Sequence, residues 1–96
     1  MFMRITILEF DPADAPAVER FWKEHSRPSA LAQPGNLAAR AFRMVQAPGK
    51  MIMAGEWAST EQADAYLQSP EHDRLLAGLA PYLKGAIVRY IGESVD

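Results

Sequence analysis

Cysteine is absent from this chain of 96 residues. Its absence excludes disulfide bonds, a thiolate nucleophile and any metal site built on thiolates. The first residues include Arg4, Glu9 and Asp11 instead of the apolar core of a secretion signal, so no signal peptide is predicted. Together these features favour the reducing cytoplasm as the location of the protein.

Long apolar runs and an excess of basic residues are also missing. No apolar run approaches the ~20 residues that a membrane-spanning helix needs, so no membrane partner is expected. The net charge is −2, and acidic residues interleave with the basic ones. Nucleic acid is therefore not expected as a partner, because phosphate binding needs a basic patch. The residue pattern contains no cluster of metal ligands, and we expect neither a metal nor another cofactor.

Hydrophobic residues, by contrast, make up 49% of the chain. A chain of this length is predicted to form one domain, residues 1–96. Such a small domain buries only about two thirds of its unfolded surface. A second copy of the chain is a natural source of further burial.

Four segments have the composition of β-strands, rich in β-branched, aromatic and other apolar side chains. The middle two flank Pro48-Gly49, which predicts a hairpin closed by a type II turn with positive φ at the glycine. The predicted strands are residues 2–10, 37–46, 51–58 and 86–92.

A first helix is predicted over residues 12–26. Asp11 is suited to cap it and Pro12 to occupy its first position, and Pro28 is expected to interrupt it. One apolar stripe has helical spacing and is expected to face the sheet: Val18, Phe21, Trp22 and His25.

A second helical region is predicted over residues 60–80. Ser59 and Gln62 have the spacing of a capping box, and Ser69-Pro70 predicts a break followed by a restart. After the break, a second stripe is expected to face inward: His72, Leu75, Leu76 and Leu79.

The order strand, helix, strand, strand, helix, strand predicts a ferredoxin-like α+β fold, with a four-stranded antiparallel sheet and both helices on one face. The strands do not alternate between apolar and polar residues. Met3, Ile5 and Ile7 share one side of the first strand, while Leu8 and Phe10 lie on the other. Because a sheet that is apolar on both faces needs two covers, the helix-free face is predicted to be buried in a homodimer.

Two sequence stretches carry a family resemblance. They are Pro34-Gly35 through the hairpin to Gly55-Glu56-Trp57-Ala58-Ser59, and Tyr66-Leu67-Gln68-Ser69-Pro70-Glu71-His72. This pattern resembles the antibiotic biosynthesis monooxygenase family of dimeric α+β-barrel proteins. The resemblance implies a pocket between helices and sheet. It also implies oxidation of phenols or quinols without a cofactor, in which the substrate anion itself donates an electron to oxygen.

The chain departs from two known patterns within that family. Quinone-forming members carry an Asn four residues before the Trp of the third strand, where this chain has Met53. Haem-degrading members have a Trp and an axial His at the positions that Tyr66 and Leu76 occupy here. Haem binding through that site is therefore not expected.

Candidate site residues follow from the two inward stripes and from the resemblance. His72 is predicted to accept a proton and Tyr66 to donate a hydrogen bond, so these two are the catalytic candidates. The alternative for the histidines and tryptophans is ordinary core packing, and for Tyr66 it is an amphipathic side chain with its hydroxyl in water. The predicted substrate-binding residues are Trp57, His25, Trp22 and Met53.

Several charged residues lie within the otherwise apolar strands: Arg4, Arg40, Arg43, Glu56 and Arg89. They are expected either to form ion pairs at a subunit interface or to include an arginine that holds an anion in the pocket.

Two functions follow for the chain as a whole. One is a cofactor-independent monooxygenase acting on a small phenolic or quinol-like compound. The other is a non-catalytic dimeric module that binds a small aromatic molecule or serves in a stress response. A void lined by Trp, Tyr and His would favour the enzyme, and a filled cavity would favour the non-catalytic module.

Overall fold

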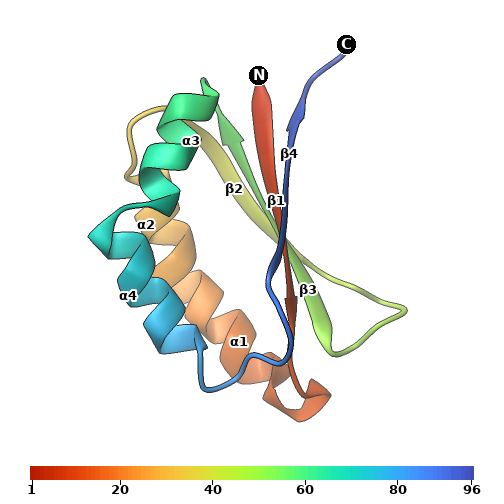
Figure 1. The fold of residues 1–96 in the computed structure, drawn as a ribbon. Coiled ribbons are helices and arrows are strands. Elements are labelled where there is room, and N and C mark those ends of the chain that lie inside the picture. Colours follow the sequence, from red (N-terminus) through yellow and green to blue (C-terminus); the bar gives the residue numbers. More distant parts are fainter.

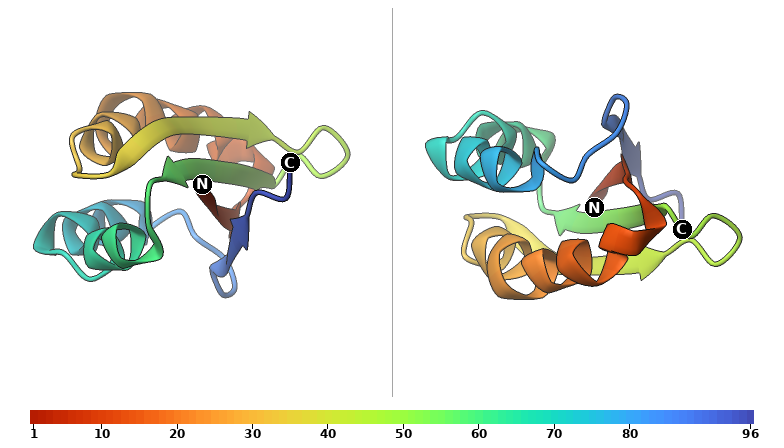
Figure 2. Two further views of the ribbon diagram at one scale, coloured as in Figure 1. Left: turned by 90° about the horizontal axis from the view of Figure 1, so that it is seen from above. Right: turned by 90° about the horizontal axis from the view of Figure 1, so that it is seen from below.

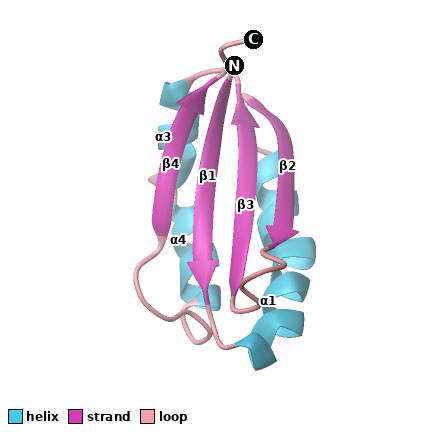
Figure 3. Cartoon of the chain, turned by 90° about the vertical axis from the view of Figure 1, so that its right-hand side faces the viewer, coloured by secondary structure: helices cyan, strands magenta, loops and turns pink.

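A computed structural model describes all residues, 1–96. Its sheet has the strand order β2-β3-β1-β4, and all neighbouring strands are antiparallel (Figure 3). The predicted four-stranded antiparallel sheet is therefore confirmed. The strands are β1 (Phe2–Glu9), β2 (Asn36–Arg43), β3 (Lys50–Trp57) and β4 (Val88–Glu93).

The helices form a single layer against one face of this sheet, which leaves the other face bare (Figures 1 and 2). This is the predicted α+β, ferredoxin-like arrangement. None of the helices has the length and apolar content needed to cross a lipid bilayer. The first helical region consists of η1 (Pro12–Asp14), α1 (Ala15–Phe21), a π-helical turn η2 (Trp22–Ser26) and α2 (Arg27–Leu31). The second consists of α3 (Thr60–Leu67) and α4 (Pro70–Leu79).

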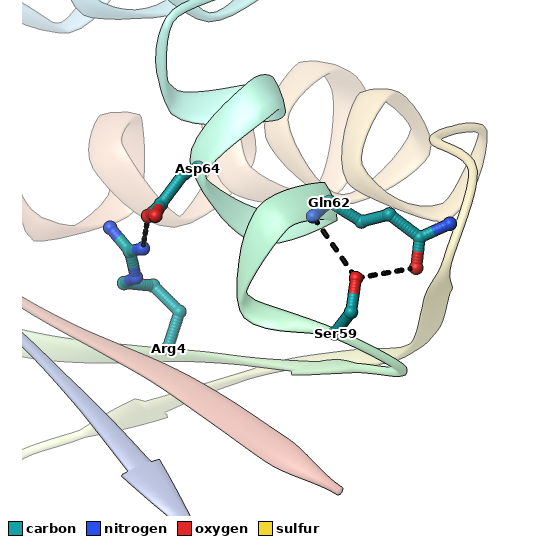
Figure 4. Close-up of polar contacts among 4 residues, drawn as sticks. All are labelled: Arg4, Ser59, Gln62 and Asp64. Atoms are coloured by element: carbon teal, nitrogen blue, oxygen red, sulfur yellow. Dashed lines mark hydrogen bonds and ion pairs between the residues drawn. The ribbon is translucent and has the colours of Figure 1, made fainter.

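Three short polar side chains begin the helical segments where the sequence predicts. The Asp11 carboxylate accepts a hydrogen bond from the amide of Ala13 at 2.9 Å. Ser59 accepts one from the amide of Gln62 at 3.2 Å and donates to the Gln62 side chain at 3.0 Å (Figure 4). Ser69 begins α4 in the same way, accepting from the amide of His72 at 3.2 Å. These bonds satisfy amides that a helix N-terminus leaves unpaired.

The π-helical turn corrects two predictions about the first helix. A π turn inserts one extra residue, so the inward-facing position passes from His25, which is exposed, to Ser26, which is 6% exposed. The prediction that His25 faces the sheet is therefore wrong. Pro28 does not interrupt the helix, because the wider turn before it relieves the usual clash of a proline ring with the preceding carbonyl.

The hairpin turn between β2 and β3 differs from the predicted type. Positive φ angles occur only at Gly35 and Gly85, so Gly49 does not adopt the conformation that a type II turn requires. Gly49 serves close packing instead. Its carbonyl accepts the amide of Phe10 at 2.8 Å, and a Cβ at Gly49 would lie 2.6 Å from the Phe10 carbonyl oxygen.

The apolar side chains divide between the two faces of the sheet. The core lies under the helices and is formed by Leu8, Phe10, Val18, Met51 and Leu79. On the opposite face, Ile5 pairs with Ala54 and Tyr90, and Ile7 pairs with Ile52 and Val88. On the same face, Tyr90 is 61% exposed, and Phe42, which pairs with Ile52, is 51% exposed. The single chain therefore leaves an apolar sheet face open to solvent.

Candidate functional site

A cavity of about 100 Å³ lies between the helices and the sheet. Of its 21 lining residues, 14 are hydrophobic, so the few polar groups in it stand out. For comparison, an apolar protein cavity of about 150 Å³ can admit benzene. The cavity is thus somewhat smaller than one that admits a single aromatic ring, and a fused-ring molecule would need the helices to move apart.

One wall of the cavity is a row of three rings. The Trp57 and Tyr66 ring centroids are 5.7 Å apart, and the Tyr66 and His72 centroids are 5.3 Å apart at an edge-on angle of 83°. Trp57 is only 3% exposed. Gly55 leaves room for the indole, because a Cβ there would lie 3.0 Å from Trp57 Nε1. The row offers an aromatic ligand both ring faces and ring edges.

His72 is held at the cavity by the first turn of α4, where Ser69 fixes its backbone amide. Its Nδ1 atom is buried and has no hydrogen-bond partner. Burial lowers the pKa of His72 below its usual value of 6.5, the positive charges of Arg89 and Arg4 lower it further, and Asp73 opposes them. The imidazole is therefore neutral at pH 7 and can accept a proton.

The Tyr66 hydroxyl forms a hydrogen bond with a residue of α2. It donates a hydrogen bond to Ser29 Oγ at 2.9 Å, and Ser29 in turn donates to the Glu71 carboxylate at 3.2 Å. Gln33 Nε2 donates to the same carboxylate at 2.8 Å. Burial raises the pKa of Tyr66, and the negative charge of Glu71 raises it further, although the bond to Ser29 lowers it. Tyr66 thus stays protonated, and its hydroxyl ties α3 to α2.

Two arginines bring positive charge to the cavity from the sheet. Arg4 of β1 and Arg89 of β4 both line it, and Arg4 forms an ion pair with Asp64 of α3 at 2.6 Å (Figure 4). Asn36 of β2 lines the cavity as well. The buried side-chain atoms without a partner are Arg4 Nε, Asn36 Oδ1 and His72 Nδ1, so all three belong to cavity-lining residues. Unpaired buried polar atoms are costly, and all three of those found here belong to residues of the same cavity.

Comparison with known proteins decides the family. The sequence profile of the antibiotic biosynthesis monooxygenase family matches residues 1–77. The chain belongs to this family. No curated protein sequence matches it significantly.

Solved structures of low sequence identity share the fold of this family member. Three of them, each provisionally assigned as an antibiotic biosynthesis monooxygenase, come from Nitrosomonas europaea, Bordetella bronchiseptica and Caulobacter crescentus. The first is 11% identical, with a TM-score of 0.86 and full coverage of both chains. The second is 14% identical, with a TM-score of 0.89 over 98% of this chain and 96% of the other. The third is 19% identical, with a TM-score of 0.86 over 99% and 90%.

Most residues that the sequence nominates for the family's pocket do line this cavity. Trp57, Trp22, Met53, Tyr66 and His72 are all among the lining residues. His25 is not, since the π-helical turn leaves it exposed, with its ring 4.9 Å from that of Phe21. His25 therefore does not share this cavity with the other nominated residues.

Three further polar residues line the cavity: Arg4, Arg89 and Asn36. Arg4 and Arg89 belong to the strand charges for which the sequence left open an anion-holding role, whereas Asn36 was not predicted to be in the pocket. Arg4 shares its side of β1 with Thr6 and Leu8, which line the cavity as well. No group of three or more His, Asp or Glu side chains is placed to hold a metal ion, and the cavity's charged groups are cationic instead.

Proposed function

We propose that this family member is a cofactor-independent monooxygenase that oxidises a small single-ring phenol or quinol in the cavity. The observation that carries the proposal is the neutral imidazole of His72, whose buried Nδ1 has no partner within a cavity-lining row of rings. The ring of the substrate lies against Trp57 and Tyr66, and Trp22 and Met53 complete the apolar lining. A structure of similar fold that is described as an antibiotic biosynthesis monooxygenase agrees with this reaction class.

His72 starts the proposed reaction by accepting the phenolic proton. The phenolate then passes one electron to O₂, and superoxide and the ring radical combine at a ring carbon that bears hydrogen. This step forms a C–O bond and gives a peroxide. Neutral phenols are poor electron donors, so proton transfer to His72 controls the rate of the electron transfer.

Breakdown of the peroxide completes the balance of atoms and electrons. The ring C–H bond and the O–O bond break, the ring proton passes to the distal peroxide oxygen, a ring carbonyl forms, and hydroxide leaves. That hydroxide takes the proton held by His72 and becomes water. The net change is phenol plus O₂ to quinone plus water, with one oxygen atom in each product.

The proposal also includes a homodimer, and the cellular location of the protein is considered with it. A second copy of the chain covers the helix-free face, where Ile5, Ile7 and Ile52 form the centre of an apolar surface. Burying that surface removes apolar area from water, which is the main driving force of association. The cytoplasmic location predicted from the cysteine-free sequence stays a prediction.

Oxygen consumption with a panel of single-ring phenols and quinols, without added cofactor, tests the reaction. We expect uptake by the wild type and a loss of about 10²–10⁴-fold in turnover for His72→Ala. His25→Ala is the matched control, since that imidazole is exposed and lies outside the cavity. Equal rates in wild type and His72→Ala would remove His72 from the mechanism. Binding without uptake of any compound would favour the non-catalytic binding module instead.

A further inference from the structure

Two arginines on neighbouring strands lie on the helix-covered face of the sheet. In the β1–β4 pairing, Arg4 is opposite Ile91 and Thr6 is opposite Arg89. Arg4 and Arg89 are therefore diagonal neighbours on one face, a relation in which residues lie about 7–8 Å apart and their Cβ atoms somewhat closer. Both side chains line the cavity. Two like charges so close favour an anion between or beside them.

The protein supplies only part of the negative charge that this pair needs. Asp64 pairs with Arg4, whose side chain is 16% exposed, but Arg4 Nε remains buried without a partner. Arg89 forms no ion pair and no side-chain hydrogen bond. Asp73, the carboxylate that raises the pKa of His72, is exposed on the first turn of α4. Two guanidinium groups against one paired carboxylate leave one positive charge at the cavity.

A carboxylate is the anion whose chemistry best matches the unpaired positive charge of the two arginines. A guanidinium group is a planar fork that binds a carboxylate through two parallel hydrogen bonds, and it remains protonated at neutral pH. Burial and the charge of Arg4 lower the pKa of Arg89, as expected for a cation that is partly removed from water beside a second cation. A bound anion would relieve both effects. The cavity volume of about 100 Å³ limits the remainder of the ligand to about one ring.

We propose that the cavity selects a monoanionic aromatic acid, a single-ring phenol whose carboxylate is held by Arg4 and Arg89. This inference deepens the proposed function by naming the substrate class, and it rests on that function for the oxidation of the phenol. The anion site itself depends on the two arginines alone. In this arrangement the carboxylate anchors the ring, while His72 faces the phenolic group.

Binding of 3-hydroxybenzoate and of 3-hydroxybenzamide provides a direct test. The two probes have the same size and the same phenol, and only the first carries a negative charge at pH 7. Tryptophan fluorescence reports binding, because Trp57 and Trp22 line the cavity. We expect the acid to bind about 10- to 100-fold more tightly than the amide, the ratio expected for hydrogen bonds to a charged group. Equal affinities, or no binding of either probe up to millimolar concentration, would overturn the proposal.

Variants locate the anion site. Arg89→Gln is expected to abolish most of the preference for the acid, and Arg89→Lys to keep part of it as a point charge. Arg20→Gln is the control, because it removes the same charge from an exposed position on α1 that does not line the cavity. Circular dichroism verifies that each variant is folded. An acid preference that survives in folded Arg89→Gln, or that disappears in Arg20→Gln, would contradict the assignment.

Oxygen consumption with the same probes separates this proposal from the function on which it rests. Acid-selective binding without oxygen uptake would support the anion site and remove the oxygenase reaction. Uptake with neutral phenols at rates equal to those with the acid would support the oxygenase and remove the anion site. We expect uptake with the acid and a kcat/KM about 10- to 100-fold lower for the amide.

Discussion

At the scale of single residues, the electrostatic surroundings of His72 set the pH range of the proposed reaction. Burial and the charges of Arg89 and Arg4 hold its pKa below 6.5. A base must be neutral to accept a proton, so kcat/KM is expected to be constant near pH 7 and to fall on the acid side, with an apparent pKa below 6.5. A pH–rate profile measures this decrease of kcat/KM on the acid side, the acid limb of the profile.

The same pKa shift affects stability with a definite sign. The unfolded chain has the higher pKa, so it binds more protons than the folded chain as the pH falls through about 6.5. Unfolding free energy is therefore expected to decrease in that range. Arg89→Gln removes a neighbouring positive charge, so it should raise the pKa of His72 and move the acid limb to higher pH. A limb that stays in place in this variant would contradict the role given to Arg89.

Tyr66 is expected to matter more for packing than for chemistry. Tyr66→Phe keeps the ring between Trp57 and His72 but removes the hydrogen bond to Ser29. We expect a loss of about 0.5–1.5 kcal/mol in unfolding free energy. Turnover should change by less than about tenfold, well below the effect of removing the base.

Urea denaturation and oxygen consumption measure these two effects. Tyr82→Phe is a suitable control, because the structure shows no side-chain hydrogen bond for Tyr82 and its ring packs against the core. A decrease in turnover of 10²-fold or more in Tyr66→Phe would show that the hydroxyl takes part in the reaction.

At the scale of helices and strands, local chemistry explains which elements could be predicted. The caps formed by Asp11, Ser59 and Ser69 depend on neighbouring residues only, and all three helix starts are found where the sequence places them. The π-helical turn does not follow from local pattern. A shift of one residue there exchanges His25 for Ser26 at the inward position, and packing against the sheet determines that choice.

The candidate site was predictable to a similar degree. Trp57 ends β3 and His72 follows a cap, so both could be located from sequence. Arg4 and Arg89 could not be assigned to one side with the same ease, because both faces of their strands are apolar. Only the register of β1 against β4 shows that the two arginines share the helix-covered face.

The entry into β2 provides a prediction at this scale. Gly35 has φ +83°, its carbonyl accepts the amide of Ala58 at 2.9 Å, and a Cβ there would lie 2.0 Å from Gln62 Oε1. Gly35→Ala therefore combines backbone strain with displacement of the Gln62 side chain that Ser59 binds. We expect a loss of about 1–3 kcal/mol in unfolding free energy, measured by urea denaturation.

The neighbouring Pro34 offers a control for this variant. Pro34→Ala lies at an exposed position and should cost less than about 1 kcal/mol, through greater freedom of the unfolded chain. If Gly35→Ala is as stable as the wild type, neither the positive φ of Gly35 nor its close packing against Gln62 stabilises the fold.

At the scale of the whole molecule, the bare sheet face and the covered face have different roles. The covered face carries the cavity and its two arginines, and the bare face carries Ile5, Ile7 and Ile52 without any polar site between them. Apolar surfaces of this kind in small proteins mark interaction sites. A second copy of the chain is a suitable partner, because every copy carries the same apolar face.

The dimer is the last prediction, and charge placed on the bare face tests it. Light scattering at micromolar concentration should give twice the mass of the chain. The interface between the two copies is expected to bury a total area on the order of 2,000 Å² or more. Ile5→Asp places a carboxylate between Ala54 and Tyr90 at the centre of that face, so it should dissociate the dimer. Leu31→Asp places the same charge on α2, where Leu31 is 42% exposed in the helix layer, and should leave the dimer intact. A monomeric wild type, or a dimer that resists Ile5→Asp but is lost in Leu31→Asp, would show that the bare sheet face is not where two chains meet.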